Sequence, residues 1–490
     1  MVELLRFGHY VDGTFTEPAA AMIDSEDPAR GVPWAQISRG DAQTADSALR
    51  SARRAFEAPS WAGLGARERA DLLETLASAI AARWPDLLDA EISDNGKRIV
   101  EVRAQFAALP VWFRAAAAQA RELKDTSLTL GMPGVSADQT HLPYGPIVAI
   151  TPWNSPLMIL SWKLAPALAA GNTVVAKPSE HASVSTLLFA DLLHEAGLPP
   201  GVFNVVTGFG AEVGAALVAH EETRFVSFTG SETGGARVAA AAAAHVVPTV
   251  LELGGKSPQI VFADADLESA VYGIASGVFL SNGQSCIAGS RLIVENAIKQ
   301  PLLERLIGRV SRLRMGDPRE PATEIGPLAN RAHADKVRAM IARAKVEGAE
   351  CVLDGVAAAH GQGACFVGPT IFDRVTPQME IWRDEVFGPV LAVASFADAE
   401  TALRLAQDTR YGLAAGVWSL DLHRARRFAE QLQVGTIYIN HYRSVDPNAP
   451  IGGIGRSGYG RELGPEAVRG FLQTRTVWTG DAPISDPFPA

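Results

Sequence analysis

Three cysteines supply the strong uncharged nucleophiles of this 490-residue chain, and one of them stands in a distinctive setting. Cys351 and Cys365 lie in or beside apolar, strand-like runs, where a cysteine is usually a small buried side chain. Cys286 has glycines three residues before and after it, which let the backbone turn tightly, and polar neighbours that favour a wet cleft. Such a thiol could attack an electrophilic carbon. Because an isolated cysteine is more often structural, the pattern alone leaves both interpretations open.

Asn154, Glu252 and Glu462 are polar residues that could assist a nucleophile, and each also has a plainer interpretation. Asn154 follows a Pro-Trp dipeptide and could be a turn residue. Glu252 precedes a glycine turn and could be a solvated glutamate. Glu462 could form a structural ion pair with its neighbour Arg461.

Seven short motifs, taken together, favour the catalytic interpretation of these residues. In chain order they are residues 151–154 (TPWN), 177–180 (KPSE), 228–231 (FTGS), 251–256 (LELGGK), 283–286 (GQSC), 385–389 (EVFGP) and 457–464 (SGYGRELG). In these motifs, their order and their approximate spacing, the chain resembles the aldehyde dehydrogenase superfamily over most of its length. The resemblance implies NAD-dependent oxidation of an aldehyde to a carboxylic acid.

The resemblance implies a role for each candidate catalytic residue. Cys286 would attack the aldehyde as a thiolate; an ordinary thiol, with a pKa of about 8.5, is only slightly ionised at neutral pH, so the site must lower that pKa or supply a base. Asn154 and the backbone N–H of Cys286 would stabilise the oxyanion that forms. Glu252 would activate the water that cleaves the thioester, provided that partial burial raises its pKa. Glu462 matches a second glutamate that serves the family as a proton relay.

The cofactor motif is a variant, since no Gly-x-Gly-x-x-Gly sequence follows a strand. In the resemblance, Gly230 and Ser231 belong to a turn where a helix N-terminus approaches the pyrophosphate. Glu180 would bind ribose hydroxyls and repel a 2′-phosphate, which favours NAD over NADP. No metal is expected. The residues implied for NAD binding are Trp153, Lys177, Ser179, Glu180, Gly230, Ser231, Leu253, Glu385 and Phe387.

Two positions depart from the family pattern at the substrate channel. Ser155 and Ile451 stand where phenylalanine is common, so we expect a reshaped channel. Arg443 could pair with a substrate carboxylate or form a structural salt bridge. The residues predicted to line the channel are Phe106, Ser155, Trp162, Ile287, His441, Tyr442, Arg443, Val445 and Ile451.

Helical and strand patterns place the motifs in an α/β fold. Apolar residues recur at helical spacing from Ala42 to Lys97. After Pro143, short apolar runs alternate with helix-length segments, which is typical of a doubly wound parallel sheet, and the alternation restarts near residue 255. We predict two doubly wound α/β domains, a Rossmann-like cofactor domain and a catalytic domain, plus a small β oligomerisation element. The predicted ranges are 1–122 and 143–254 for the NAD-binding domain, 255–454 for the catalytic domain, 123–142 and 470–490 for oligomerisation, and 455–469 for a return to the cofactor domain.

Composition narrows the class of protein. A formal net charge of -10 without a continuous basic stripe argues against nucleic acid as a partner. No signal-peptide pattern and no apolar stretch of about 20 residues is visible, so we expect no membrane association. Three scattered cysteines cannot form a disulfide framework, which favours a reducing compartment, and we expect a cytoplasmic protein. The expected partners are a small aldehyde and further copies of the chain, in a homodimer or homotetramer.

Two other functions compete with hydrolytic aldehyde oxidation. A dehydrogenase that transfers the acyl group to coenzyme A would share the fold and the cysteine, but that branch generally lacks a glutamate at the position of Glu252. A catalytically silent protein on the same fold would be signalled by loss of Cys286, Asn154 or Glu252, and all three are present.

Overall fold

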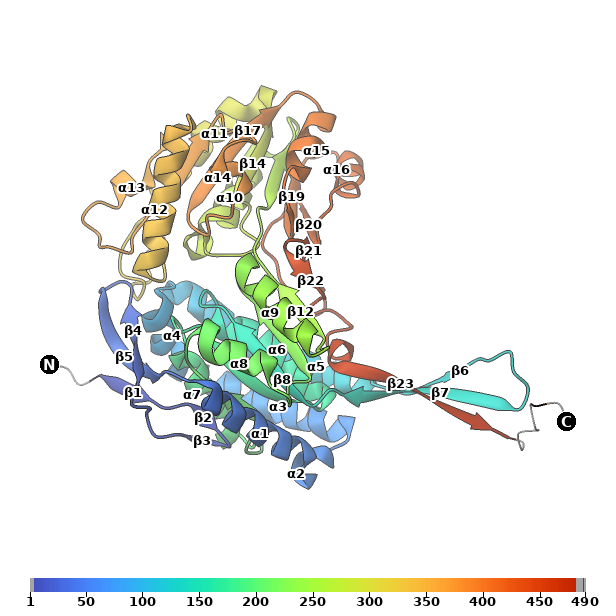
Figure 1. Ribbon diagram of the computed structural model, residues 1–490. Coiled ribbons are helices and arrows are strands. Elements are labelled where there is room, and N and C mark those ends of the chain that lie inside the picture. The colour runs from blue at the N-terminus through green and yellow to red at the C-terminus, as the bar shows by residue number, and fades with distance from the viewer. Residues whose placement is uncertain (1–3, 482–487, 489–490) are drawn as a thin grey trace.

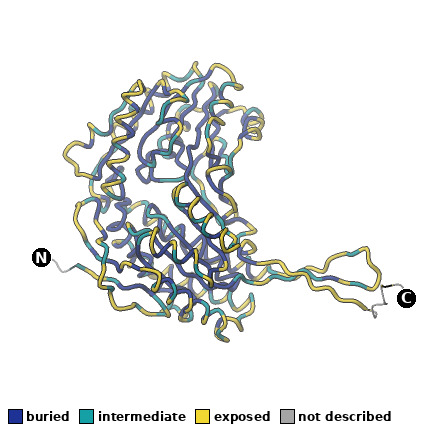
Figure 2. Tube along the Cα trace, in the orientation of Figure 1, coloured by how far each residue is buried: buried dark blue, intermediate teal, exposed yellow. Residues whose placement is uncertain are grey.

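Two lobes, each built on a mostly parallel sheet, and a projecting three-stranded arm make up the computed structural model, which describes residues 4–481 and 488 (Figure 1). The strands of both lobes are buried, whereas the arm is largely exposed along its length (Figure 2). Within the described residues, no helix is both long and apolar enough to cross a membrane.

The first lobe contains an eight-stranded sheet in the order β22-β12-β11-β8-β9-β10-β2-β3. Adjacent residues of one central strand point to opposite faces, because Val148 and Ile150 pack into one apolar cluster and Ile147 and Ala149 into another. Helices therefore cover both faces, as in a doubly wound fold. The strands are β2 (Tyr10–Val11), β3 (Thr14–Phe15), β8 (Pro146–Thr151), β9 (Thr173–Pro178), β10 (Phe203–Val205), β11 (Phe225–Thr229), β12 (Thr249–Glu252) and β22 (Gly458–Tyr459). The helices are α1 (Ala42–Glu57), α2 (Pro59–Ala62), α3 (Ala66–Arg83), α4 (Leu88–Asn95), α5 (Ile99–Glu122), α6 (Pro156–Ala170), α7 (Val184–Glu195), α8 (Ala215–Ala219) and α9 (Glu232–Ala244).

The second lobe contains a seven-stranded sheet in the order β15-β16-β17-β14-β13-β19-β20. Its strands also face two clusters, since Ile260 and Ile293 pack on one side and Val261 and Leu292 on the other. The strands are β13 (Pro258–Val261), β14 (Arg291–Glu295), β15 (Glu350–Leu353), β16 (Thr370–Asp373), β17 (Val390–Phe396), β19 (Ala414–Trp418) and β20 (Thr436–Ile439). The helices are α10 (Leu267–Phe279), α11 (Asn296–Val310), α12 (Arg331–Val346), α13 (Gly355–Ala358), α14 (Glu380–Arg383), α15 (Ala399–Gln407) and α16 (Leu422–Ala429).

The arm joins segments far apart in sequence. Strand β7 (Val135–Pro143) pairs antiparallel with β6 (Thr126–Leu128) on one side and with β23 (Leu472–Gly480) on the other. The arm thus joins parts of the two predicted oligomerisation segments, 123–142 and 470–490, of which residues 482–487 and 489–490 lie outside the described residues.

The prediction of two doubly wound α/β domains is confirmed. What the periodicity did not predict is a set of short strands before residue 42: β2 and β3 extend the first sheet, and β1 (Leu5–Phe7), β4 (Met22–Asp27) and β5 (Val32–Ser38) form a separate three-stranded sheet.

Candidate active site

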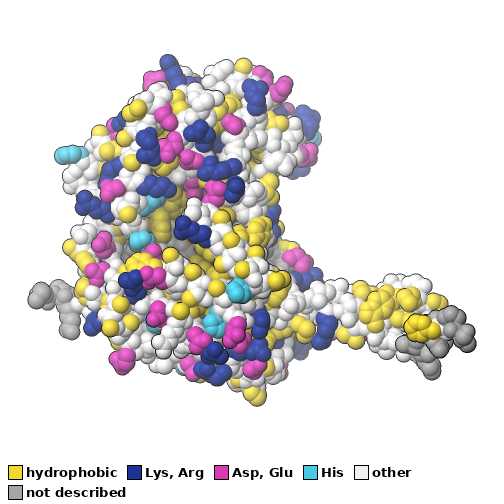
Figure 3. All heavy atoms as spheres, in the orientation of Figure 1, with side chains coloured by type: hydrophobic (Ala, Val, Ile, Leu, Met, Phe, Trp, Pro, Cys, Tyr) yellow, Lys and Arg dark blue, Asp and Glu magenta, His cyan; other side chains and the backbone are white. Residues whose placement is uncertain are grey.

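The two lobes enclose a cavity at the point where the first sheet reverses its winding. Strands β8 and β11 are neighbours in the sheet, and the chain continues from β8 to β9 and β10 on one side and from β11 to β12 on the other. In doubly wound sheets, ligands bind at the carboxyl ends of two such strands. A hollow between the lobes, below α12, is visible in the space-filling view (Figure 3). The cavity has a volume of about 220 Å³ and is lined by Pro152, Trp153, Asn154, Ile159, Thr229, Gly230, Ser231, Leu253, Gly254, Cys286, His333, Lys336, Glu385 and Phe387.

Tight packing of the preceding turn positions Cys286. Gly283 has a φ of +73°, and a Cβ on it would lie 2.0 Å from the carbonyl oxygen of Gly388, so only glycine fits there. This contact joins the nucleophile segment to the turn that carries Glu385 and Phe387. The Asn154 side chain donates from Nδ2 to the carbonyl oxygen of Gln284 at 2.9 Å, which places its amide beside the same segment.

The Cys286 thiol keeps its proton in the protein alone. Burial, together with the nearby carboxylates of Glu385 and Glu252, raises the pKa of the thiol to about 12, against the opposing effects of the Ile287 backbone N–H and the Arg443 guanidinium. The sequence left two ways to ionise the thiol: a lowered pKa or a base. The structure does not lower the pKa, so a base or a bound ligand must promote loss of the proton.

Glu252 ends strand β12 as a buried carboxyl group without a hydrogen-bond partner at Oε1. Burial raises its pKa, and the neighbouring Glu462 raises it further, while Lys163 and Arg461 oppose the shift. A Cβ on Gly452 would lie 2.7 Å from Glu252 Oε1, so this glycine leaves the space beside the carboxyl open. A carboxyl group of raised pKa with a free oxygen has the properties required of a general base for water.

Glu462 forms an ion pair with Lys163, not with Arg461. Lys163 Nζ contacts Glu462 Oε1 and also donates to Ser227 Oγ at 3.0 Å, and Ser227 Oγ donates to Glu462 Oε1 at 3.2 Å. Arg461 instead donates to the carbonyl oxygens of Gly453 and Gly460. Glu462 therefore does form an ion pair, as one interpretation of the sequence expected, but its partner is Lys163, 299 positions away in the chain, and not Arg461.

The cofactor side of the cavity combines a helix N-terminus with an aromatic cluster. Ser231 caps α9 by accepting from the Gly234 N–H at 3.1 Å, so the first turn of this helix opens on the cavity. The rings of Trp153, His333 and Phe387 lie within 5.1–6.0 Å of each other, centroid to centroid. Burial lowers the pKa of His333 to about 4, so the neutral ring donates from Nε2 to the carbonyl oxygen of Phe387 at 2.7 Å.

The residues predicted for the cofactor fall into two groups. Trp153, Gly230, Ser231, Leu253, Glu385 and Phe387 line the cavity. Lys177, Ser179 and Glu180 lie outside it, at and just after the end of β9, where Lys177 Nζ stands 3.5 Å from Glu180 Oε2. Glu385 accepts from the Gly255 N–H at 2.9 Å, and burial raises its pKa to about 7.

Sequence reasoning missed two polar residues on the cavity wall. His333 and Lys336 stand three positions apart near the start of α12, on one face of the helix, and both line the cavity. The sequence feature that could have revealed them is Asn330, a helix-capping residue type just before this polar pair. Its side chain caps α12 by accepting from the His333 N–H at 2.8 Å.

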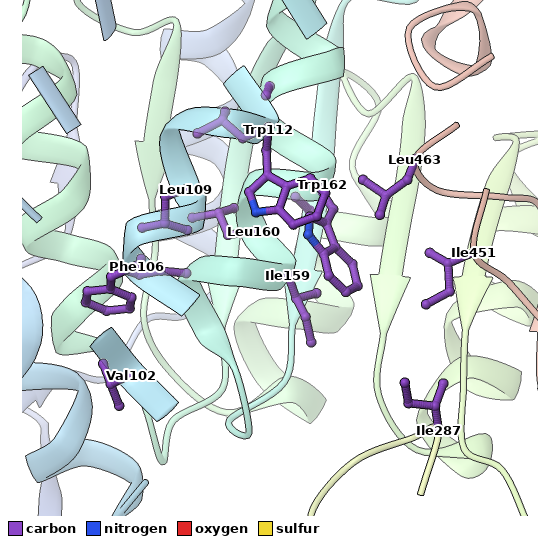
Figure 4. Close-up of a cluster of buried hydrophobic side chains, with 14 of the residues drawn as sticks. Val102, Phe106, Leu109, Trp112, Ile159, Leu160, Trp162, Ile287, Ile451 and Leu463 are labelled. Atoms are coloured by element: carbon purple, nitrogen blue, oxygen red, sulfur yellow. The ribbon is translucent and has the colours of Figure 1, made fainter. Parts of the chain in front are cut away.

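The predicted channel residues are only partly brought together. Trp162 and Ile159 on α6 face Ile287 and Ile451 across the close-up of Figure 4, whereas Phe106 lies apart from them. Phe106 is fully buried in the apolar core on α5, so its assignment to the channel is corrected: the side chain packs within the helical layer. The loop that carries the remaining candidates, His441, Tyr442, Arg443 and Val445, is tied to the nucleophile segment because Tyr442 donates to the carbonyl oxygen of Ile287 at 2.9 Å. Ser155 is buried at the N-terminus of α6.

Comparisons with known proteins agree with this geometry. A sequence profile described as the aldehyde dehydrogenase family matches residues 15–477. The chain is 40% identical over 487 residues to (Z)-2-((N-methylformamido)methylene)-5-hydroxybutyrolactone dehydrogenase of Acinetobacter baylyi, covering 99% of each chain. It is 43% identical over 482 residues to betaine aldehyde dehydrogenase of Cereibacter sphaeroides, covering 98% of each. Betaine aldehyde dehydrogenase from Staphylococcus aureus, solved in complex with NAD+, superposes with a TM-score of 0.96 at 35% identity, covering 99% of this chain and 97% of the other.

Proposed function

The chain belongs to the aldehyde dehydrogenase family and is an NAD-dependent oxidoreductase acting on aldehydes, and from this premise we propose that the oxidation runs through a covalent thioester on Cys286. The observation that carries the proposal is the shared cavity: Cys286 and Asn154 line it together with Ser231, Glu385 and Phe387. The thiol, an amide donor and the groups suited to the cofactor therefore face one space.

The residues of the cavity suit NAD in their chemistry. The N-terminus of α9, at Ser231, offers backbone N–H groups to a pyrophosphate, and the Glu385 carboxyl can accept from ribose hydroxyls. Phe387 and Trp153 offer ring faces at the same wall. Held by these residues, NAD would supply the hydride acceptor.

The reaction then follows from groups of the chain. After the Cys286 thiol has lost its proton to solvent, its sulfur forms a bond to the aldehyde carbon, and the oxygen that gains the electron pair accepts hydrogen bonds from the Asn154 amide and the Cys286 backbone N–H. After hydride loss the carbon is a thioester. Glu252 takes a proton from water as the water oxygen bonds to that carbon, the bond to sulfur breaks, and the carboxylic acid leaves. Glu462 and Lys163, paired beside Glu252, provide a route for its proton.

Glu252 favours water over coenzyme A as the acceptor of the acyl group, because it places a base of raised pKa beside the site. The test is NADH absorbance with a panel of aldehydes, with and without coenzyme A, and identification of the product. We expect NADH and free acid without coenzyme A. Turnover that requires coenzyme A, or no NADH with any aldehyde, would contradict the proposal.

Glu180 is proposed to set the choice of coenzyme. Its carboxylate is three-quarters buried beside Lys177 Nζ, at the end of β9, where it would accept from ribose hydroxyls and repel a 2′-phosphate. We expect the unmodified enzyme to have a higher kcat/KM with NAD than with NADP, and Glu180→Ser to narrow that ratio about tenfold, a typical worth of one charge-assisted contact. Glu195→Ser, on an exposed glutamate of α7, is the matched control. A native preference for NADP would overturn the assignment.

The predicted domain ranges remain a proposal that the strand assignment supports. The first sheet draws its strands from residues 10–252 and from β22 at 458–459, which fits a return of the chain to the cofactor domain after residue 454. The second sheet draws its strands from residues 258–439.

The arm is proposed to join subunits into a homodimer or homotetramer. Met132, Val477 and Trp478 are exposed on it by 57%, 42% and 58%. Strand β23 also forms an edge of the arm, and a long edge strand with exposed apolar side chains is a liability unless a partner covers it. A two-fold symmetric dimer is the smallest assembly that would do so.

Light scattering at micromolar concentration tests the assembly. We expect a mass of at least two 51.9 kDa chains, and a larger single-chain fraction in Trp478→Asp, because the charge would be buried in the interface. Tyr272→Asp, on an exposed tyrosine of α10, should leave the mass unchanged. A stable, active single chain of the native sequence would show that the arm closes on its own subunit.

A reducing compartment, and within it the cytoplasm, is proposed from the cysteines. Cys286, Cys351 and Cys365 are all free thiols in the structure. The proposed mechanism requires Cys286 in this form, and a reducing compartment would maintain it.

A further inference from the structure

Lys97 and Arg443 are cations beside the site that lack a carboxylate partner in the described structure. Among the described residues, no carboxylate oxygen lies within 4.0 Å of Lys97 Nζ or of the Arg443 guanidinium. Lys163 and Lys177, which are also buried, each have a glutamate partner. Since burying a charge without a counterion is costly, an unpaired cation at a site points to a ligand that supplies the opposite charge.

Lys97 reaches the site from the segment between α4 and α5. It is 6% exposed, and its Nζ donates to Ser155 Oγ at 2.5 Å and to Gln105 Oε1 at 3.1 Å. Ser155 directly follows the proposed oxyanion donor Asn154. Burial lowers the pKa of Lys97 to about 8, so the ammonium keeps most of its charge at neutral pH.

Arg443 reaches the site from the second lobe, on the loop that Tyr442 ties to Ile287. Its Nη1 donates to the carbonyl oxygens of Ser276 at 3.2 Å and Leu280 at 3.0 Å, and its Nη2 makes a long contact of 3.4 Å with Ser281 Oγ. The backbone holds Arg443 at a φ of +67°, a conformation that non-glycine residues seldom adopt and that often marks functional positions.

Comparison with a structural guanidinium shows what Arg443 lacks. Arg291 is fully buried, and its Nε, Nη1 and Nη2 donate to four backbone carbonyl oxygens. Arg443 is half-buried, and within the described chain its Nε makes no hydrogen bond. The structural salt bridge considered for Arg443 from the sequence is therefore absent from the described structure, and donors remain for a ligand.

The ionised groups around this end of the site leave a positive excess. Arg98 pairs with Glu101 at 3.1 Å, and Glu101 also accepts from the Ser281 N–H at 2.7 Å. Burial raises the pKa of Glu91, the other carboxyl group that acts on Lys97, to about 7, so it is partly protonated at neutral pH. Arg98, Lys97 and Arg443 together lower the pKa of Glu101, so three cations share this one carboxylate and a positive excess remains.

Among the predicted channel residues of this end, Trp162, His441 and Tyr442 carry rings, and the Trp162 ring packs against Trp112 with centroids 5.7 Å apart (Figure 4). Recognition of a quaternary ammonium group relies on aromatic faces. Ser155, Val445 and Ile451 have none, and the Tyr442 ring is packed against Tyr438 at 5.0 Å with its hydroxyl committed to Ile287.

We propose that Lys97 and Arg443 make the end of the site away from the cofactor cavity a receptor for an anionic group, so that the substrate is an aldehyde that carries a carboxylate and not one that carries a quaternary ammonium group. This substrate class rests on the proposed function. It differs from the substrate named for the betaine aldehyde dehydrogenases to which the chain is similar.

Two pairs of aldehydes that match in shape and differ in charge test the proposal in the full-length enzyme with NAD. Succinic semialdehyde is compared with 4-methylpentanal, and betaine aldehyde with 3,3-dimethylbutanal, each by kcat/KM at low ionic strength. We expect the carboxylate to be favoured over its neutral isostere at least about tenfold, and betaine aldehyde to be disfavoured against its isostere by a similar factor. Betaine aldehyde equal to or better than 3,3-dimethylbutanal would overturn the proposal.

Substitution of Arg443 assigns the preference to the residue. Arg443→Met should lower the ratio of succinic semialdehyde to 4-methylpentanal about tenfold or more, and Arg443→Lys should keep part of it. Arg309→Met, on an exposed arginine of α11, removes the same charge elsewhere and should leave both ratios unchanged. An unchanged ratio in a folded Arg443→Met enzyme overturns the role of Arg443; if that variant does not fold, the ratios of the native enzyme decide. Oxidation of neutral aldehydes without a charge preference refutes this inference alone, whereas no NADH with any of the four aldehydes refutes the proposed function.

Discussion

Replacing Cys286 by alanine is expected to abolish aldehyde-dependent NADH production, with a fall in kcat of at least about 10⁴-fold, because the hydride leaves a carbon that is covalently bound to sulfur. Without that bond the aldehyde carbon has no tetrahedral intermediate from which hydride can depart. The cavity wall loses one small side chain, while Ser231, Glu385 and Phe387 remain. The measurement is NADH absorbance over a long time course at high enzyme concentration.

Two controls make the result specific. NAD should still bind the Cys286→Ala enzyme with an affinity close to that of the native enzyme, as measured by calorimetry, since the thiol is not among the groups proposed to hold the cofactor. Cys351→Ala removes another half-buried thiol, on β15, and should leave the rate unchanged. Retention of more than a small fraction of native turnover in Cys286→Ala would show that the covalent mechanism is wrong.

Replacing Glu252 by glutamine is expected to separate the two halves of the reaction. The amide cannot take a proton from water, so steady-state turnover should fall about 10²- to 10⁴-fold, the usual contribution of a general base. Hydride transfer does not use this carboxyl, so stopped-flow absorbance should still show a burst of one NADH per active site. The native enzyme should gain rate with rising pH as Glu252, whose pKa burial raises, loses its proton.

The matched control for Glu252 is Glu462→Gln. Glu462 lies beside Glu252 and pairs with Lys163, so its loss should slow turnover less and should lower the pH at which the rate rises, because its charge raises the pKa of Glu252. Steady turnover in Glu252→Gln together with stalling in Glu462→Gln would transfer the role of base to Glu462.

The central strands, and the meeting of several candidate residues at one cavity, were predictable because their signals are local. A strand that is buried on both faces has a short apolar run as its sequence. The runs at residues 147–150 and 225–228 form β8 and β11, which pair with each other in the sheet. Motifs that follow such strands lie at carboxyl ends of the sheet, so Asn154 and Ser231 reached one cavity.

The remaining features depend on contacts that no local pattern encodes. The partner of Glu462 is Lys163 on α6. The two residues are far apart in the sequence, and only the folded chain brings them together. Phe106 has the type of a channel residue, but the rotation of α5 turns it into the core. His333 lines the cavity because α12 crosses it from the second lobe, and the strands before residue 42 are too short to show a period.

Intact-mass spectrometry of Glu252→Gln, quenched in acid after mixing with NAD and an aldehyde, tests the covalent mechanism most directly. We predict that each chain gains the mass of the substrate less two hydrogens, as an acyl thioester requires, located by peptide mapping on Cys286 and removed by hydroxylamine. The double variant Cys286→Ala, Glu252→Gln should show no added mass. An unmodified chain after one full burst of NADH, or an acyl group on Cys351 or Cys365, would contradict a thioester on Cys286.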